Sequence, residues 1–393
     1  MPTDFERQLS QSFSIDPNAD WVRAHNREAH DVLAAYRADK PTRVPVFAAD
    51  HPHVHGFYMD EQSLDYRDYY SDPVLMAKVQ LEAARRRREI PIYDCDQIGV
   101  LPDSWPMCVD LHPVQPFGWV GCRVEFREDC VPAHVPMRIS KRECLDLPMP
   151  DPRTGGVLAT VERYYRFMRE NYEGKIRFLG RPVGPVTHSV CHHGLFSLAL
   201  NIRGEELMSD MHDAPDFVHG FLRKLISWID ELQAAWHGDA ARAWPLEFSD
   251  HGIEMLSPEL YEKFIVAAIE HANAAKGASP GTNLHHCGSG TRLFPVMKRH
   301  FGLTRINALT FPLVDIAKVR AELGPDVWID ASIADQILML GPPESIRQAV
   351  KDLMESGAKG AGRLSIGVGD MPRGIPLAHY EALYASIKEF GGY

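Results

Sequence analysis

Short apolar runs alternate with longer amphipathic segments along most of this chain. Eight of these runs have the pattern of strands, and each is followed by sequence with helical periodicity. They begin near residues 44, 92, 175, 244, 282, 305, 327 and 362. Eight strand–helix pairs predict an α/β fold, a (β/α)8 TIM barrel. A doubly wound open sheet is the alternative, but no Gly-x-Gly-x-x-Gly follows the first strand.

Two segments differ from the repeating part. Residues 1–40 predict an N-terminal helical extension, with a helix over about 21–38 that ends before Pro41. Residues 102–154 are rich in Pro and Cys, and their short alternating runs predict an inserted hairpin with loops, or lid. We therefore expect the barrel to comprise residues 41–393, with 102–154 inserted into it.

Charge and cysteine usage narrow the possible partners and compartment. Lys and Arg number 42 against 53 Asp and Glu, a net charge of −11, which argues against nucleic acid or an anionic membrane as main partner. The basic run 85–88 is expected to be a solvated helix end. No apolar run approaches membrane-spanning length. The seven cysteines are scattered without a C-x-x-C pair, so we expect a cytoplasmic protein.

Titratable and polar side chains gather where a barrel places its chemistry, at the carboxyl ends of strands and in the loops after them. These positions are Asp50, His51, His53, His55, Asp94, Asp96, His188, Cys191, His192, His193, Glu247, Asp250, His251, His285, Cys287, Asn307, Asp330 and Asp370. Their concentration on one rim predicts an enzyme.

The strongest candidate is the run 282–290, Thr-Asn-Leu-His-His-Cys-Gly-Ser-Gly. In an extended segment residues two apart point to the same side, so His285 and Cys287 share a face while His286 points away. Imidazole and thiolate together suit zinc. The alternative is a rim histidine beside a buried, inert cysteine.

Other rim residues are candidates for substrate binding. The alternate spacing of His51, His53 and His55 allows a cluster on one side, although Pro52 disturbs a regular strand. His188 and His192 precede a helix start, where free N–H groups favour an anionic substrate group, or are simply loop histidines. Asn307 and Asp330 are polar rim residues suited to substrate contact.

Several motifs in order resemble the uroporphyrinogen decarboxylase superfamily, and within it the cobalamin-dependent, zinc-containing methyltransferases. The matching pieces are Asp250-His251-Gly252 with 256–264, His285-x-Cys287-Gly288, 184–185 with 203–207, 341–346, 375–377 and the ending 390–393. The similarity covers most of residues 40–393. It implies a barrel in which His285 and Cys287 bind zinc, and family members are often homodimers.

Two departures from the family pattern change what the resemblance implies. Decarboxylases of porphyrinogens carry an arginine-rich segment after the first strand, whereas residues 50–55 contain no arginine, which argues against a substrate with several carboxylates. The zinc methyltransferases usually have a further cysteine near the last strand, where this chain has Val368. Glu247, Asp250 or Asp370 could complete the metal shell in its place.

The resemblance implies a zinc-dependent methyltransferase or demethylase. It would move a methyl group between a small substrate and a thiol or a corrinoid on a partner protein, with Asp250 and Asp50 as catalytic carboxylates. One alternative is a decarboxylase or lyase acting without metal, in which Asp50 or Asp250 stabilises a cationic intermediate. Another is a non-catalytic protein that binds a small ligand or a corrinoid partner at the barrel mouth.

Overall fold

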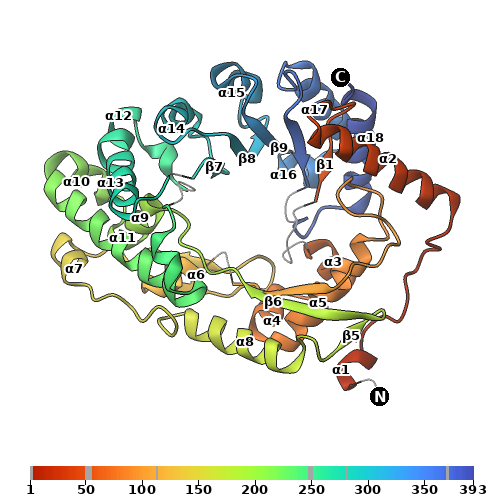
Figure 1. Ribbon diagram of the computed structural model, residues 1–393, viewed down its shortest axis with the longest axis horizontal. Coiled ribbons are helices and arrows are strands. Elements are labelled where there is room, and N and C mark those ends of the chain that lie inside the picture. The colour runs from red at the N-terminus through yellow and green to blue at the C-terminus, as the bar shows by residue number, and fades with distance from the viewer. Residues whose placement is uncertain (1–2, 49–54, 112–113, 247–250, 280, 369–370) are drawn as a thin grey trace. The chain divides into compact units, whose positions relative to one another are not determined.

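The computed structural model describes residues 3–48, 55–111, 114–246, 251–279, 281–368 and 371–393. The chain forms two compact units, and Figure 1 traces the elements of both in chain order. Unit 1 holds Met1–Asp110, Tyr164–His188 and Ala308–Tyr393, and unit 2 holds Leu111–Arg163 and Ser189–Asn307.

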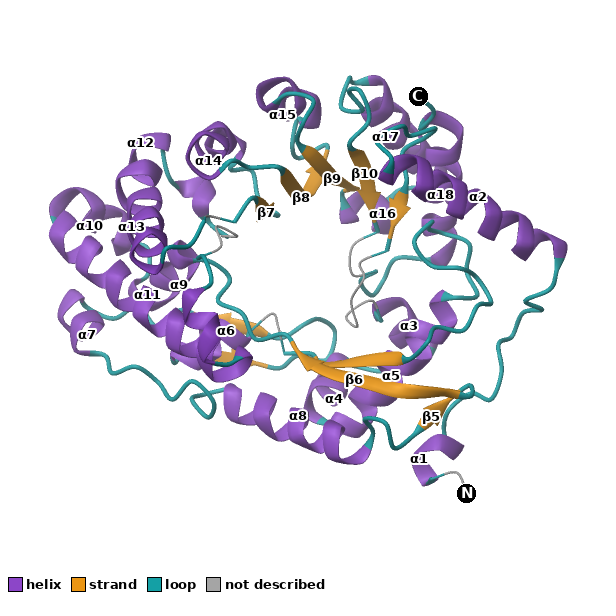
Figure 2. Ribbon diagram, viewed as in Figure 1, coloured by secondary structure: helices purple, strands orange, loops and turns teal. Residues whose placement is uncertain are grey.

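Unit 1 contains parallel strands from both ends of the chain, drawn in orange in Figure 2. One series runs in the order β1 Val46–Phe47, β10 Leu364–Gly367, β9 Trp328–Ile333 and β8 Arg305–Phe311, whose first residues belong to unit 2. A second sheet has the order β2 Trp105–Val109, β6 Arg181–His188 and β5 Arg177–Phe178. The pairs β1–β10, β10–β9 and β2–β6 are parallel, as a barrel built from strand–helix units requires.

Some helices of unit 1 begin at a side-chain cap, and α5 Pro73–Arg87 is an example. Asp72 accepts a hydrogen bond from the amide of Val74, and Pro73 occupies the first turn of the helix that follows. The helices are α1 Asp4–Arg7, α2 Asp20–Arg37, α3 Gly56–Glu61, α4 Tyr66–Ser71, α5 Pro73–Arg87, α15 Ile316–Leu323, α16 Asp335–Leu340, α17 Pro343–Glu355 and α18 Leu377–Phe390. Helix α8 Leu158–Asn171 begins in unit 2 and ends in unit 1.

Unit 2 is mostly helical around one short parallel pair. Strand β7 Asn283–His285 pairs with the start of β8, and the hairpin β3 Arg123–Glu125 and β4 Ala133–Val135 is antiparallel. Its α-helices are α6 Gln115–Val120, α7 Lys141–Asp146, α9 Leu195–Arg203, α10 Glu206–Asp213, α11 Pro215–His237, α12 Pro258–Leu260, α13 Ala267–Lys276 and α14 Phe294–Phe301. The 3-10 turns η1 Asp239–Ala243, η2 Ile253–Met255 and η4 Thr291–Leu293 and the π-helical turn η3 Tyr261–Val266 complete the unit.

The core of unit 2 lies along α11, which packs against α9 and α13. The buried positions of α11 repeat with helical spacing, so one stripe of the helix faces its neighbours. This stripe consists of Val218, Phe221, Leu222, Leu225, Ile229 and Leu232. Among the described residues, no helix is long and apolar enough to span a membrane.

Several expected elements are present close to their predicted bounds. The helix expected at 21–38 is α2, the hairpin expected within 102–154 is β3–β4, and the strands expected near 44, 282, 305, 327 and 362 are β1, β7, β8, β9 and β10. The expected strand near 175 is only the two-residue β5, and the much longer β6 follows it directly. Sequence analysis missed β6 because Pro182, Gly184 and Pro185 punctuate it like a loop.

The strand expected over 92–101 is wrong, and β2 lies instead at Trp105–Val109, within the segment assigned to the insertion. Ile92, Tyr93 and Ile98 are buried as a strand would bury them, but the backbone turns. Between these residues, Asp94 forms an ion pair with Arg43, and Asp96 forms ion pairs with Arg87 and Arg88. Of the strand expected near 244, residues 244–246 form none, and 247–250 lie outside the described residues.

A buried ion pair fixes the turn that replaces the expected strand. The guanidinium of Arg43 donates to both oxygens of Asp94, at 2.7 and 2.9 Å. Asp94 also accepts from the amide of Val46 on β1 and from the hydroxyl of Tyr384 on α18. Asp94, expected at the rim, therefore ties the first strand of unit 1 to its last helix.

The arginine run at the end of α5 is paired, not solvated as expected. Arg85 bonds to Glu82 and Glu89, and Arg87 lies 3.1 Å from a carboxylate oxygen of Asp96. These side chains are largely buried, so neighbouring carboxylates, rather than water, satisfy their charges.

Replacing Asp94 with Ala is expected to destabilise the protein by about 3–5 kcal/mol, because it removes the buried, doubly bonded partner of Arg43 and leaves the longer 3.3 Å contact with the more exposed Glu28. Urea unfolding followed by circular dichroism measures this loss. Glu389→Ala is the matched control, since it removes an exposed ion pair with Arg347 and should cost at most about 1 kcal/mol. Equal losses in the two variants would contradict the structural role of Asp94.

Candidate metal centre

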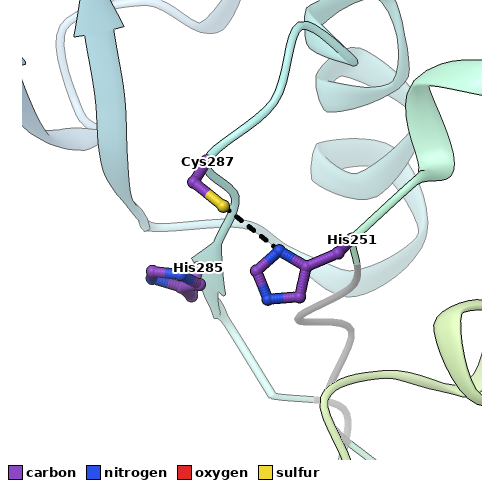
Figure 3. Close-up of side chains that lie close together, drawn as sticks. All are labelled: His251, His285 and Cys287. Carbon is purple, nitrogen blue, oxygen red and sulfur yellow. Dashed lines mark hydrogen bonds between the residues drawn. The ribbon is translucent and has the colours of Figure 1, made fainter. Parts of the chain in front are cut away.

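Three side chains of unit 2 converge at the carboxyl end of β7: His251, His285 and Cys287 (Figure 3). One possible ligand atom from each lies within 4.8 Å of the others. The Cys287 Sγ atom is 3.1 Å from His251 Nδ1. His285 and Cys287 are exposed and His251 is half-buried, so the cluster is open to small molecules.

The turn after β7 explains why two neighbouring histidines point in opposite directions. His286 is fully buried, and its Nε2 accepts a hydrogen bond from the amide of Gly290. A Cβ atom on Gly288 would lie 2.9 Å from the His286 ring and 3.0 Å from a carboxylate oxygen of Glu254. Only glycine fits this close approach, so the turn holds Cys287 on the face that carries His285.

Helix α9 fixes the backbone of His251 through one hydroxyl group. Ser197 Oγ accepts from the His251 amide at 2.8 Å and donates to the His251 carbonyl at 2.5 Å. Ser197 is buried, so these contacts do not compete with water. His251 is followed by Gly252 at φ +79°, a conformation that glycine adopts readily.

The orientation of His285 is set by the neighbouring strand. His285 and Asn307 are register partners in the β7–β8 pair, and His285 Nδ1 lies 2.8 Å from Asn307 Oδ1. An amide oxygen only accepts, so Nδ1 carries the proton and Nε2 presents its lone pair. Histidine ligands of metals commonly have a partner of this kind. Asn307, expected to bind substrate, thus contacts a candidate ligand.

The surroundings shift the pKa values of two of the three groups. Shielding from water lowers the pKa of His251, and the nearby His285 and His286 lower it further. Although Cys287 as a whole residue is exposed, shielding of its thiol raises the pKa above the ordinary value. Without a cation the cluster therefore holds a neutral imidazole beside a protonated thiol.

The donor set fits a divalent transition metal. Zinc binds sulfur at about 2.3 Å and nitrogen at about 2.1 Å, which places S and N about 3.6 Å apart in a tetrahedron. The 3.1 Å contact between Cys287 and His251 must open by about half an ångström for such an ion. Glu254 supports the fit, because its buried Oε2 has no hydrogen-bond partner among the described residues. A cation bound at the cluster would compensate the negative charge of the Glu254 carboxylate.

Sequence analysis had placed His251 on the rim without a role, and it missed Glu254 and Ser197. The run Asp250-His251-Gly252 at a strand end was the available signal for His251. Six candidates lie outside the described residues: Asp50, His51, His53, Glu247, Asp250 and Asp370. Val368, which stands where the family has a cysteine, is a buried apolar residue of unit 1.

The remaining candidates of unit 1 lie in separate surroundings. His55 is buried and stacks on Tyr69 with ring centres 4.3 Å apart, and its Nε2 is 3.9 Å from Asp110. His188 ends β6, with its ring edge-on to Tyr165. Asp330 on β9 accepts a hydrogen bond from the buried Ser365 hydroxyl on β10.

His192 is in unit 2 but is not among the three converging groups. Its ring is buried, and Nδ1 accepts a hydrogen bond from the amide of Gly194 at 3.1 Å. It lines a cavity of about 160 Å³ together with Val190, Cys191, Leu232, Gln233, His237 and Trp244. Shielding from water lowers the pKa of His192 to about 4.

The strand–helix fold and the imidazole–thiol cluster at a strand end define an α/β protein with a candidate metal centre. The chain belongs to the uroporphyrinogen decarboxylase (URO-D) family, whose model matches residues 27–390. A solved structure of a methyltransferase from Methanosarcina mazei is similar in fold, with a TM-score of 0.57 and 17% sequence identity over 92% of this chain and 98% of that one. These findings confirm the expected TIM-barrel fold class. No curated protein sequence matches the chain.

The buried His192 predicts a loss of stability in acid. Its ordinary pKa is 6.5 and its pKa in the folded protein is about 4, so between these values only the unfolded state takes up the proton. Stability should therefore fall by up to about 3 kcal/mol as the pH drops from 6.5 to 4. Urea unfolding over this range measures it. His192→Asn, whose side-chain oxygen can still accept from Gly194, should show a shallower dependence, and parallel profiles would refute the assignment.

Proposed function

We propose that the protein is a zinc-dependent methyltransferase or demethylase. It moves a methyl group between a small substrate and a thiol, or a corrinoid carried by a partner protein. The observation that carries the proposal is the convergence of His251, His285 and Cys287 at a strand end. Membership of the URO-D family and the fold likeness to a methyltransferase support the choice of reaction.

His251, His285 and Cys287 would hold the ion, and three protein donors leave a fourth position for substrate, as in catalytic zinc sites. Bound zinc lowers the pKa of a coordinated thiol and polarises a heteroatom that leaves as the methyl group is transferred. His285 and Cys287 are exposed, which leaves the substrate side open. Asn307 keeps the proton of His285 on Nδ1, and Ser197 holds the backbone of His251.

The role of the carboxylates remains part of the proposal. Asp250 directly precedes His251, so a substrate bound at the centre would lie within reach of this part of the chain. We assign Asp250 to orienting the substrate and Asp50 to a second catalytic carboxylate. Glu247 and Asp370 stay candidates for additional ligands.

A metal-free decarboxylase or lyase is the second candidate, favoured by the name of the family itself. Such an enzyme would bind a carboxylated substrate and stabilise a cationic intermediate with Asp50 or Asp250. The segment 50–55 contains no arginine for such a substrate. Turnover of a porphyrinogen by chelator-treated protein would establish this reaction and reject the first proposal.

The metal content tests the proposed centre directly. We expect about one zinc ion per chain by elemental analysis, and Cys287→Ala or His251→Ala should weaken zinc binding by more than about a hundredfold. Cys130→Ala and His212→Ala are matched controls in the same unit, because neither side chain is among the converging groups, and both variants should bind zinc like the wild type. Wild-type protein without stoichiometric metal, even after incubation with zinc, would reject the proposal.

Asn307 is expected to tune the centre without binding the ion. Asn307→Leu removes the acceptor for His285 Nδ1 and should weaken zinc affinity about 10- to 100-fold, measured by competition with a chromophoric chelator. Asn307→Asp keeps an acceptor and should retain most of the affinity. Equal affinities for the Leu variant and the wild type would contradict this role.

A further inference from the structure

A row of rings in unit 2 leads from the β3–β4 hairpin to His251. The His193 ring lies 5.3 Å from the His251 ring, centre to centre, at an angle of 36°. Phe117 of α6 meets His193 edge-on at 5.9 Å. On its other side Phe117 stacks on His134 of β4 at 4.0 Å. These separations are those of favourable ring contacts, so the row is a continuous packed path.

The far end of this row is anchored. His134 Nε2 lies 2.8 Å from the side-chain oxygen of Asn201 on α9. The chain after the hairpin is bonded along the same helix, with the amide of Met137 donating to the Asn201 carbonyl and that of Ile139 to the Ile202 carbonyl. Helix α9 also carries Ser197, which fixes the backbone of His251. Both ends of the row are therefore held by hydrogen bonds to helix α9.

His193 holds its place in the row with an unusual backbone. Its φ is +50°, in the left-handed region that residues with a Cβ atom rarely adopt. The next residue, Gly194, also has a positive φ, and its amide bonds to the buried His192. Glycine or asparagine would occupy the position of His193 at lower conformational cost. A ring is present where the backbone alone favours a smaller residue, and this ring contacts those of Phe117 and His251.

We propose that His193 is a positioning residue of the metal centre: its ring, backed by Phe117 and His134, holds the His251 imidazole in the orientation that faces Cys287. The inference rests on the proposed metal-binding function. His193 is not one of the three groups whose ligand atoms converge, so it acts through His251. By this proposal, position 193 requires a planar ring, whatever its chemistry. Because His134 lies on β4, the β3–β4 hairpin is then part of the scaffold that holds the metal centre.

Three variants separate the ring from the backbone. His193→Asn keeps a side chain suited to a positive φ but removes the ring, His193→Phe keeps a flat ring without nitrogen atoms, and Phe117→Leu removes the support behind it. Arg138→Asn is the matched control, because Arg138 also has a positive φ in unit 2 and its exposed side chain pairs with Glu205. Zinc affinity, the absorption spectrum of the cobalt(II)-loaded protein and the melting temperature of metal-free protein are measured for each.

We expect His193→Asn to bind zinc about tenfold more weakly and to change the cobalt(II) spectrum, with a metal-free melting temperature equal to or above that of the wild type. Phe117→Leu should weaken binding in the same direction, whereas His193→Phe and Arg138→Asn should stay within about twofold of the wild type. If His193→Asn and Phe117→Leu both retain wild-type affinity and spectrum while Cys287→Ala loses zinc, His193 has no positioning role and only this inference fails. Wild-type protein that binds no metal overturns the proposed function together with it.

Discussion

The candidate centre depends on the two-residue repeat of an extended strand that ends in a turn only glycine can make. The repeat brings His285 and Cys287 to one face of β7, and the buried His286 anchors the other face through the Gly290 amide. The close packing at Gly288 excludes any side chain that would move Cys287. His251 comes from a separate loop, and its backbone is held by the Ser197 hydroxyl. Strand alternation thus places two candidate donors, His285 and Cys287, and the long-range contact with Ser197 places the third, His251.

This division explains how much of the site sequence alone could predict. His285, Cys287 and the inward direction of His286 follow from strand alternation, a property of neighbouring residues. The place of His251 depends on Ser197, which lies 54 positions away in the chain. The contact of Asn307 with His285 depends on the register between β7 and β8. Neither the distant hydroxyl nor the register leaves a periodic signal in the sequence.

The fold, like the site, has parts that the local sequence pattern predicts and parts that long-range contacts determine. Strands β7, β8, β9 and β10 were predictable because each is a short run with clear boundaries that buries side chains, at alternate positions in β7 and β9 and at consecutive positions in β10. The 92–101 segment has the same apolar signal but forms a turn, because Asp94 bonds at once to Arg43, a strand amide and Tyr384. Four hydrogen bonds to one buried carboxylate outweigh the strand preference of the residues around it. A hydrophobic pattern therefore predicts burial more reliably than it predicts backbone conformation.

Charge bears on which side chain could act as the third donor of the proposed zinc site in this chain. The resemblance to zinc methyltransferases assigns two cysteines and one histidine to the ion, and two thiolates neutralise a divalent cation. Here Val368 stands at the position of the second cysteine, and His251 converges with His285 and Cys287 in unit 2. Two neutral imidazoles and one thiolate would leave one positive charge in a partly shielded site, which is unfavourable. The buried Oε2 of Glu254, which has no hydrogen-bond partner among the described residues, lies beside the Cys287–Gly288 turn and would supply the missing negative charge. A histidine in place of the cysteine, together with the nearby carboxylate of Glu254, would keep the charge of a zinc-loaded site close to neutral.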